Sequence, residues 1–261
     1  MTYLDILQQI QYRGSRAVAM VPDTWQQGRS LFGGLQAALN LMAMRTLVPQ
    51  DYPLRTLQTT FVAPVPAGSV TANASTLRSG KNTQHVQAMI GDPQQPQCNC
   101  IAVFGKGRES AIQRKLTAPA QPQEPPKPFL YLQGLTPNFT RYFDARWLSG
   151  DLPYSSSAHN DALIEVSMKE SGTTSEAHLL AIADFIPPLA LAKLSTPTAG
   201  SSLTWMLEIL DTDFQQEPLQ DWWVAAEMTA ASDGYTSQSA VIYAPSGKAV
   251  ALSRQSMVIF A

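Results

Sequence analysis

Asp184 interrupts an apolar run that follows Glu176 in residues 176–190, which have the sequence EAHLLAIADFIPPLA. Leu179, Ile182 and Ile186 recur at the spacing of one helix face, which predicts a buried helix. A carboxylate at a buried position costs free energy unless other groups hydrogen-bond it. The chain must therefore bring polar side chains to Asp184 from other segments.

Ser202 and Gln255, on two predicted strands downstream, can supply those hydrogen bonds. Gln255 shares a strand face with Ala251 and Met257, as expected for an inward-pointing residue. Each polar residue alone also has a structural interpretation: Asp184 as a helix cap, Ser202 as a turn residue, and Gln255 as an exposed strand residue. The order of the elements favours the interpretation that the three form one site.

A second buried helix is predicted over residues 35–48, where Ala and Leu dominate and apolar residues recur on one face. Gly33 and Gly34 precede it, and their lack of a side chain allows backbone to approach closely. Either a neighbouring strand or a ligand can make that approach. The other elements of this half are predicted as a short helix over 3–10 and strands over 13–21, 57–62, 70–78, 83–90 and 98–105.

The second half of the chain repeats this order in outline, with few shared identities. Its long helix is predicted over 174–194, ended or kinked by Pro187 and Pro188. Aromatic residues in the preceding segment are interpreted either as core or as the lining of a ligand tunnel: Phe139, Tyr142, Phe143 and Trp147. Strands are predicted over 162–169, 202–210, 222–230, 236–243 and 249–260.

Residues 118–129, APAQPQEPPKPF, contain five prolines in twelve positions. This density excludes a helix and a central strand, and it predicts an extended linker. The predicted organisation is therefore an N-terminal module over 1–117, a Pro-rich linker over 118–129 and a C-terminal module over 130–261.

The composition favours a folded chain with a substantial core, because 44% of the residues are apolar and only 15% are charged. The net charge of −2 and the lack of a basic stripe argue against nucleic acid as a partner. The longest apolar runs fall short of the roughly 20 residues that span a bilayer, so no membrane span is expected. The N-terminus lacks the features of a signal peptide, and a cytoplasmic location is the expectation.

The three histidines and two cysteines do not occur at the spacing of a metal-binding site. Cys98 and Cys100 alternate on a predicted strand and point to the same face, as small strand residues. His178 lies about 120° around the helix from Asp184, which favours a satisfied or surface histidine over a partner of the carboxylate. We expect neither a metal site nor another cofactor.

Six short segments, taken in order, resemble the thioesterase II (TesB-like) family of double-hotdog acyl-CoA thioesterases. The resemblance covers nearly the whole chain apart from the linker, and it implies an α+β fold. In that double hotdog, two antiparallel sheets, each wrapped around a long helix, join back to back in one chain. The segments are FGG at 32–34, TTFVAP at 59–64, TLRSGKNT at 76–83, ADFIP at 183–187, SLTW at 202–205 and SGKAVALSRQ at 246–255.

The resemblance also implies a site in which an Asp, a hydroxyl and a Gln hold the water that attacks a thioester carbonyl. It places these catalytic roles on Asp184, Ser202 and Gln255. Ser202 stands where the family pattern has Thr, and it keeps the hydroxyl. A shift of two residues in the register would place Thr204 there instead, so Thr204 is kept as a substrate-binding candidate.

Four more substrate-binding candidates rest on the resembling segments. Gly33 and Gly34 offer backbone N–H groups at a helix start, which can stabilise an oxyanion. Phe61 and Arg78 lie in the two strand segments of the first half.

The implied activity is hydrolysis of acyl-CoA thioesters, with acyl-CoA as the partner molecule. The alternative is a non-catalytic protein that binds acyl thioesters on the same fold, since a fold does not fix a function. A hydratase ranks last because the chain lacks an Asp–His pair on one short loop. The sequence is compatible with a homodimer or a homotetramer.

Overall fold

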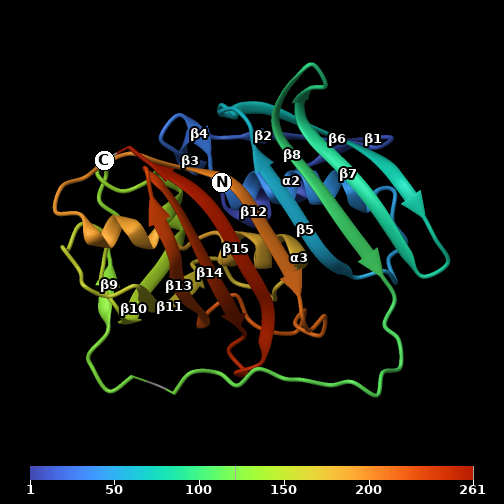
Figure 1. Ribbon diagram of the computed structural model, residues 1–261. Helices are drawn as coiled ribbons and strands as arrows, with labels where there is room; N and C mark the ends of the chain where they lie inside the picture. Colours follow the sequence, from blue (N-terminus) through green and yellow to red (C-terminus); the bar gives the residue numbers. More distant parts are fainter. Residues whose placement is uncertain (121, 261) are drawn as a thin grey trace.

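The computed structural model describes residues 1–120 and 122–260, so Gln121 of the predicted linker and Ala261 of the predicted second module lie outside the described residues. Two α-helices, α2 (Gly33–Arg45) and α3 (Glu176–Ala183), lie on one face of a large antiparallel sheet (Figure 1). A third, α1 (Tyr3–Gln8), opens the chain, and three 3-10 helices connect other elements: η1 (Asp23–Trp25), η2 (Asn138–Tyr142) and η3 (Leu189–Lys193).

The predicted strands appear in the predicted order, since alternating apolar and polar residues give them one buried face, and β3, β4, β9 and β10 form where no strand was predicted. In the first half they are β1 (Gln11–Arg13), β2 (Arg16–Val21), β3 (Gln26–Gln27), β4 (Ser30–Leu31), β5 (Leu54–Phe61), β6 (Gly68–Ser79), β7 (Thr83–Asp92) and β8 (Gln95–Gly105). In the second half they are β9 (Lys127–Phe129), β10 (Phe143–Ser149), β11 (Asp161–Met168), β12 (Gly200–Ile209), β13 (Trp222–Ser232), β14 (Tyr235–Tyr243) and β15 (Ala249–Ile259). The strand predicted over 13–21 is instead a hairpin of β1 and β2, because Gly14 turns the chain with a φ of 61°.

The two halves of the chain share one continuous sheet. Among the described residues it has thirteen strands, in the order β1-β2-β6-β7-β8-β5-β12-β15-β14-β13-β11-β10-β9. The halves meet edge to edge where β5 pairs with β12, for example at Thr59 opposite Trp205. The expectation of two sheets joined back to back is therefore wrong in this detail. Edge-to-edge pairing satisfies the backbone groups that two separate sheets would leave open at their edges.

α2 is the central helix of the first half and is buried on almost every side. It packs against β2, β6, β7, β8 and α3. Gly34 permits the contact with α3, because a Cβ atom at this position would lie 2.9 Å from the backbone oxygen of Leu180. Close packing of two helices thus accounts for Gly34.

α3 is much shorter than the helix predicted over 174–194, which was wrong in its length. Ser175 caps its N-terminus, and Asp184 is already its C-cap residue. Pro187 and Pro188 follow, and neither can continue a helical hydrogen-bond ladder. Asp184 therefore lies at a helix end, and helical structure resumes only at η3.

The described residues between β8 and β9 run along the end of the molecule opposite the β3–β4 hairpin (Figure 1). They lead into β9, an edge strand that pairs with β10. Pro128 is tolerated there because an edge strand leaves one row of backbone groups unpaired. The division into modules 1–117 and 130–261 stays a prediction.

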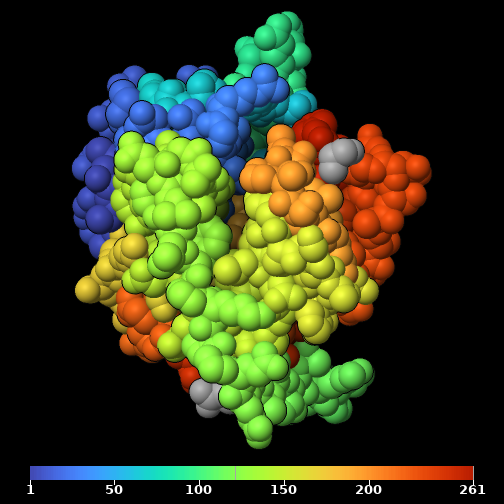
Figure 2. Space-filling view, turned by 90° about the vertical axis from the view of Figure 1, so that its left-hand side faces the viewer, coloured from blue at the N-terminus to red at the C-terminus, as the bar shows by residue number. Residues whose placement is uncertain are grey.

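Aromatic packing joins the N-terminal segment to residues 138–147 of the second half. Trp25 stacks on Tyr142 with ring centroids 4.2 Å apart, and Phe32 stacks on Phe139 at 4.0 Å. Trp147 is 1% exposed. These segments lie next to each other on the face shown in Figure 2. The aromatic group is therefore core, as the first of its two interpretations holds.

Within the described residues, no helix is both long and apolar enough to cross a membrane.

Replacing Gly34 by Ala should lower the free energy of unfolding by about 2 kcal/mol, because the new methyl group overlaps a backbone oxygen that cannot rotate away. Urea denaturation measures the change. Gly107→Ala is the matched control, since a Cβ there meets only a side-chain nitrogen of Arg55 at 3.8 Å. Equal stability of the two variants would contradict the assigned contact.

Candidate functional site

A hydrogen bond between Gln255 and Asp184 forms the centre of the candidate site. Nε2 of Gln255 on β15 donates to Oδ1 of Asp184 at the end of α3, over 2.6 Å. Both side chains are buried, at 3% and 9% exposure. The two residues that the sequence placed in one site, 71 positions apart, are thus brought together.

The carboxyl group of Asp184 has its pKa raised from 3.8 to about 7. Burial is the largest cause, because a charged carboxylate loses its hydration. Hydrogen bonding from the backbone N–H of Gly34 and from Gln255 acts in the opposite direction and lowers the pKa. The helix N-terminus at Gly34 adds positive potential that favours the charged form. A group with this pKa exchanges a proton readily at neutral pH.

Gly33 and Phe61, both from the first half, border the other oxygen of Asp184. A Cβ atom on Gly33 would lie 2.6 Å from Oδ2 of Asp184 and 2.9 Å from the ring of Phe61. Only glycine fits there. The carboxylate of the second half is therefore held at the helix start of the first half, and the site spans both.

Ser202 lies on the same face of the sheet as Gln255. It pairs with Met257 on β15, two residues from Gln255, and residues directly opposite on paired strands share a face. A bulge between Ser202 and Thr204 changes the register, so Thr204 pairs with Ser256 and is exposed on the other face. Of the two hydroxyls, the structure places Ser202 and not Thr204 on the side of Asp184.

Arg78 is not brought into this group. In the sheet register, Phe61 on β5 is aligned, across β8 and β7, with Ala72 on β6. Arg78 lies six residues further along β6, or roughly 20 Å at the rise of a strand. A role for Arg78 in contacting substrate stays a prediction.

Gln238 on β14 is a member of the site that sequence reasoning missed. Its Nε2 donates to Oε1 of Gln255 over 3.2 Å, and its Oε1 accepts the backbone N–H of Leu189 over 2.9 Å. It is 2% exposed and directly opposite Gln255 in the sheet. The alternation of β14 places Gln238 between buried positions, and this is the signal that could have found it.

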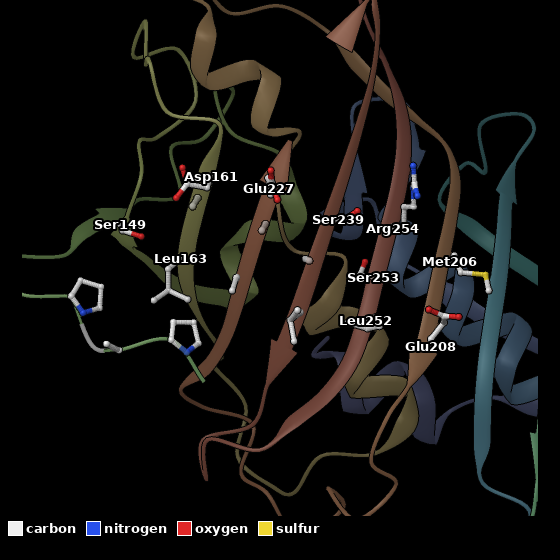
Figure 3. Close-up of a pocket in the computed structure, with 18 residues that line it drawn as sticks. Ser149, Asp161, Leu163, Met206, Glu208, Glu227, Ser239, Leu252, Ser253 and Arg254 are labelled. Atoms are coloured by element: carbon white, nitrogen blue, oxygen red, sulfur yellow. The ribbon is translucent and has the colours of Figure 1, made fainter. Parts of the chain in front are cut away.

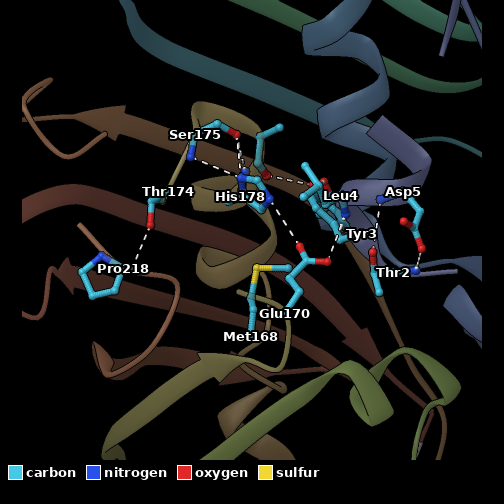
Figure 4. A network of polar contacts seen from close by, with 12 residues as sticks. Thr2, Tyr3, Leu4, Asp5, Met168, Glu170, Thr174, Ser175, His178 and Pro218 are labelled. Carbon is cyan, nitrogen blue, oxygen red and sulfur yellow. Dashed lines mark hydrogen bonds and ion pairs between the residues drawn. The ribbon is translucent and has the colours of Figure 1, made fainter. Parts of the chain in front are cut away.

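His178 belongs to a separate polar cluster that anchors α1 (Figure 4). Its Nδ1 lies 2.7 Å from Oγ of Ser175, and its Nε2 lies 3.3 Å from Oε1 of Glu170. Burial acts to raise the pKa of Glu170, but hydrogen bonds from His178 and from the backbone N–H of Leu4 outweigh it, and the pKa is lowered. His178 is a buried, partnered histidine and contacts α1 rather than Asp184.

A groove of about 550 Å³ lies over strands of the second half (Figure 3). Its floor consists of outward-facing residues of the second half, such as Leu252 and Arg254, which alternate with the inward Gln255. Residues 119, 120 and 122 border it. The groove is therefore separate from the candidate site.

The architecture around this site matches proteins of the hotdog class. A conserved protein of unknown function with a hot dog fold from Alicyclobacillus acidocaldarius is similar with a TM-score of 0.87 and 20% identity, over 100% of this chain and 99% of that chain. An acyl-CoA thioesterase II from Mycobacterium marinum has a TM-score of 0.75 and 18% identity, over 99% and 97%. A tesB protein of Mycobacterium avium subs paratuberculosis has a TM-score of 0.77 and 13% identity, over 100% of both chains. Identities this low establish the fold alone.

Sequence models of two domains identify the family. The acyl-CoA thioesterase N-terminal domain matches residues 21–105, and the acyl-CoA thioesterase C-terminal domain matches residues 115–259. The second match alone spans more than half of the chain, and this protein belongs to the acyl-CoA thioesterase family. No match was found among curated proteins.

Asp184→Asn should gain stability relative to the parent as pH rises. The folded pKa of about 7 lies above the unfolded value of 3.8, so the folded parent binds the proton more tightly and loses stability between about pH 4 and pH 7. Asn does not titrate, and the difference between the two proteins should change by about 4 kcal/mol across this window. Urea denaturation from pH 4 to pH 8 measures it.

Asp161→Asn, at an exposed carboxylate, is the matched control and should show no such trend. A difference between Asp184→Asn and the parent that stays constant with pH would refute the raised pKa.

Proposed function

We propose that this protein hydrolyses acyl-CoA thioesters to the free acid and CoA, with Asp184 as the general base. The observation that supports this most is a buried carboxyl group whose pKa is raised to about 7 and which Gln255 holds in one orientation. A general base works best when its pKa lies near the operating pH. Membership of the acyl-CoA thioesterase family supports the same reaction.

In the proposed reaction, Asp184 takes a proton from a water molecule, and the water oxygen attacks the thioester carbonyl carbon. The carbonyl oxygen becomes an oxyanion in a tetrahedral intermediate. The C–S bond then breaks, and the thiolate of CoA receives the proton that Asp184 took up. Water and thioester give acid and thiol, and Asp184 is regenerated.

The N-terminus of α2 is the proposed oxyanion site. The first N–H groups of a helix have no intrahelical acceptor. The N–H of Gly34 interacts with Asp184, which leaves the N–H of Gly33 as the better candidate for the developing oxyanion. A hydrogen bond from this N–H stabilises an oxyanion more strongly in a buried site than in water.

Ser202 is proposed to help hold the attacking water, because it shares the face of Gln255 and its hydroxyl can donate or accept. Phe61, beside Gly33 and Asp184, is proposed to contact the acyl thioester. Thr204, exposed on the other face, takes no part in this proposal.

The test is thiol release from a panel of acyl-CoAs of different chain length. Asp184→Asn should lower kcat/KM by at least about 100-fold, because the general base is lost. Gln255→Ala should lower it by about 10-fold or more, because a hydrogen bond to a charged group is removed. Ser202→Ala should lower it by about 10-fold.

Ser201→Ala is the matched control for Ser202→Ala, since Ser201 is the exposed neighbour on the same strand. Unchanged turnover in both Asp184→Asn and Gln255→Ala would sink the assignment. Binding of acyl-CoA by the parent without release of thiol would instead favour the alternative, a non-catalytic acyl-thioester binding protein.

A further inference from the structure

We propose that Gln238 is a positioning residue that fixes the direction of the Gln255 amide, an inference that rests on the proposed function. Gln238 lies behind Gln255 as seen from Asp184, so it acts on the carboxylate only through Gln255. Three hydrogen bonds run in series from Leu189 through Gln238 and Gln255 to Asp184.

The direction of this series begins at a backbone N–H, which can only donate. The N–H of Leu189 donates to Oε1 of Gln238, so the NH₂ group of Gln238 must point the other way. That NH₂ group donates to Oε1 of Gln255, which leaves the NH₂ group of Gln255 facing Asp184. Each amide is thereby held in the one orientation that satisfies both of its neighbours.

The two prolines after Asp184 explain why Leu189 is the anchor. Pro187 and Pro188 have no N–H group, and Leu189 is the first residue of η3. An N–H at the start of a helical turn has no acceptor within that turn. It is therefore available to Gln238, and the segment that ends α3 also orients the site.

Without Gln238, the Gln255 amide could rotate and present its oxygen to Asp184. Oxygen and NH₂ are nearly equal in size, so packing alone does not choose between them. A carbonyl dipole facing the carboxylate disfavours its charged form. The base would then be protonated over a wider range of pH, and the water would lose its acceptor.

Gln238→Met keeps the volume and removes both hydrogen bonds. It should lower kcat about tenfold with KM nearly unchanged, since Gln238 is buried behind Gln255 and does not reach the substrate. It should also move the inflection of the pH profile up by about one pH unit. The Asp184 carboxyl resonance, followed by ¹³C NMR titration, should shift in the same direction.

Gln238→Glu gives a rescue that a merely structural role would not. In its protonated form, the new acid accepts from Leu189 with its carbonyl and donates to Gln255 with its hydroxyl. At pH 6 it should therefore retain more activity than Gln238→Met. Gln58→Met, the same substitution at an exposed strand position, is the matched control and should match the parent.

A parent enzyme that turns over, together with a folded Gln238→Met variant of unchanged kcat and unchanged Asp184 titration, would overturn this inference alone. Equal activities of Gln238→Met and Gln238→Glu at pH 6 would also overturn it. A parent that releases no thiol would refute the proposed function, and the Asp184 titration would still decide the role of Gln238.

Discussion

The hydrogen bond from Gln255 to Asp184 constrains the rest of the structure. It joins the last strand to the end of α3, and it holds the carboxylate against the N-terminus of α2. Gly33 must lack a side chain for this approach. The pairing of β5 with β12 sets the two halves in one sheet, so that a carboxylate from the second half meets a helix start from the first.

In the proposed function, this arrangement gives up stability at neutral pH for a carboxyl group that can exchange a proton. A buried carboxylate loses hydration, and a hydrogen bond from Gln255 and an N–H from Gly34 restore only part of it. The result is a group poised between its charged and neutral forms at neutral pH. Around it, α2 and α3 pack closely at Gly34, and the ring of Phe32 stacks on that of Phe139.

Much of the fold could be predicted from the sequence, because strand alternation and turn residues are local signals. Most strands in each half followed from these signals, whereas the pairing of Asp184 with Gln255 was expected from the order of the elements and from the family resemblance. The single continuous sheet could not be predicted in this way, because edge pairing between distant strands leaves no local pattern in the sequence. Apolar spacing also continued past Asp184, so the predicted helix was longer than α3, although Pro187 and Pro188 marked the region where the helix ends.

Side-chain direction was the harder part of the site to predict. A single bulge between Ser202 and Thr204 decides which hydroxyl lies on the same face of the sheet as Gln255, and alternation alone cannot locate a bulge. Strand alternation marks Gln238 as an inward-pointing residue, but only the sheet register shows that it lies opposite Gln255. Arg78 belongs to a segment that resembles the family, but it lies further along the strands of the sheet than Phe61.

Single-turnover hydrolysis in H₂¹⁸O, followed by mass spectrometry of the product acid and of the peptide containing Asp184, tests the central claim most directly. If Asp184 acts as a base on water, the first turnover puts one ¹⁸O atom into the acid and leaves Asp184 unlabelled. An unlabelled acid with ¹⁸O in the carboxyl group of Asp184 would show that the carboxylate attacks the thioester itself, and this would contradict the account.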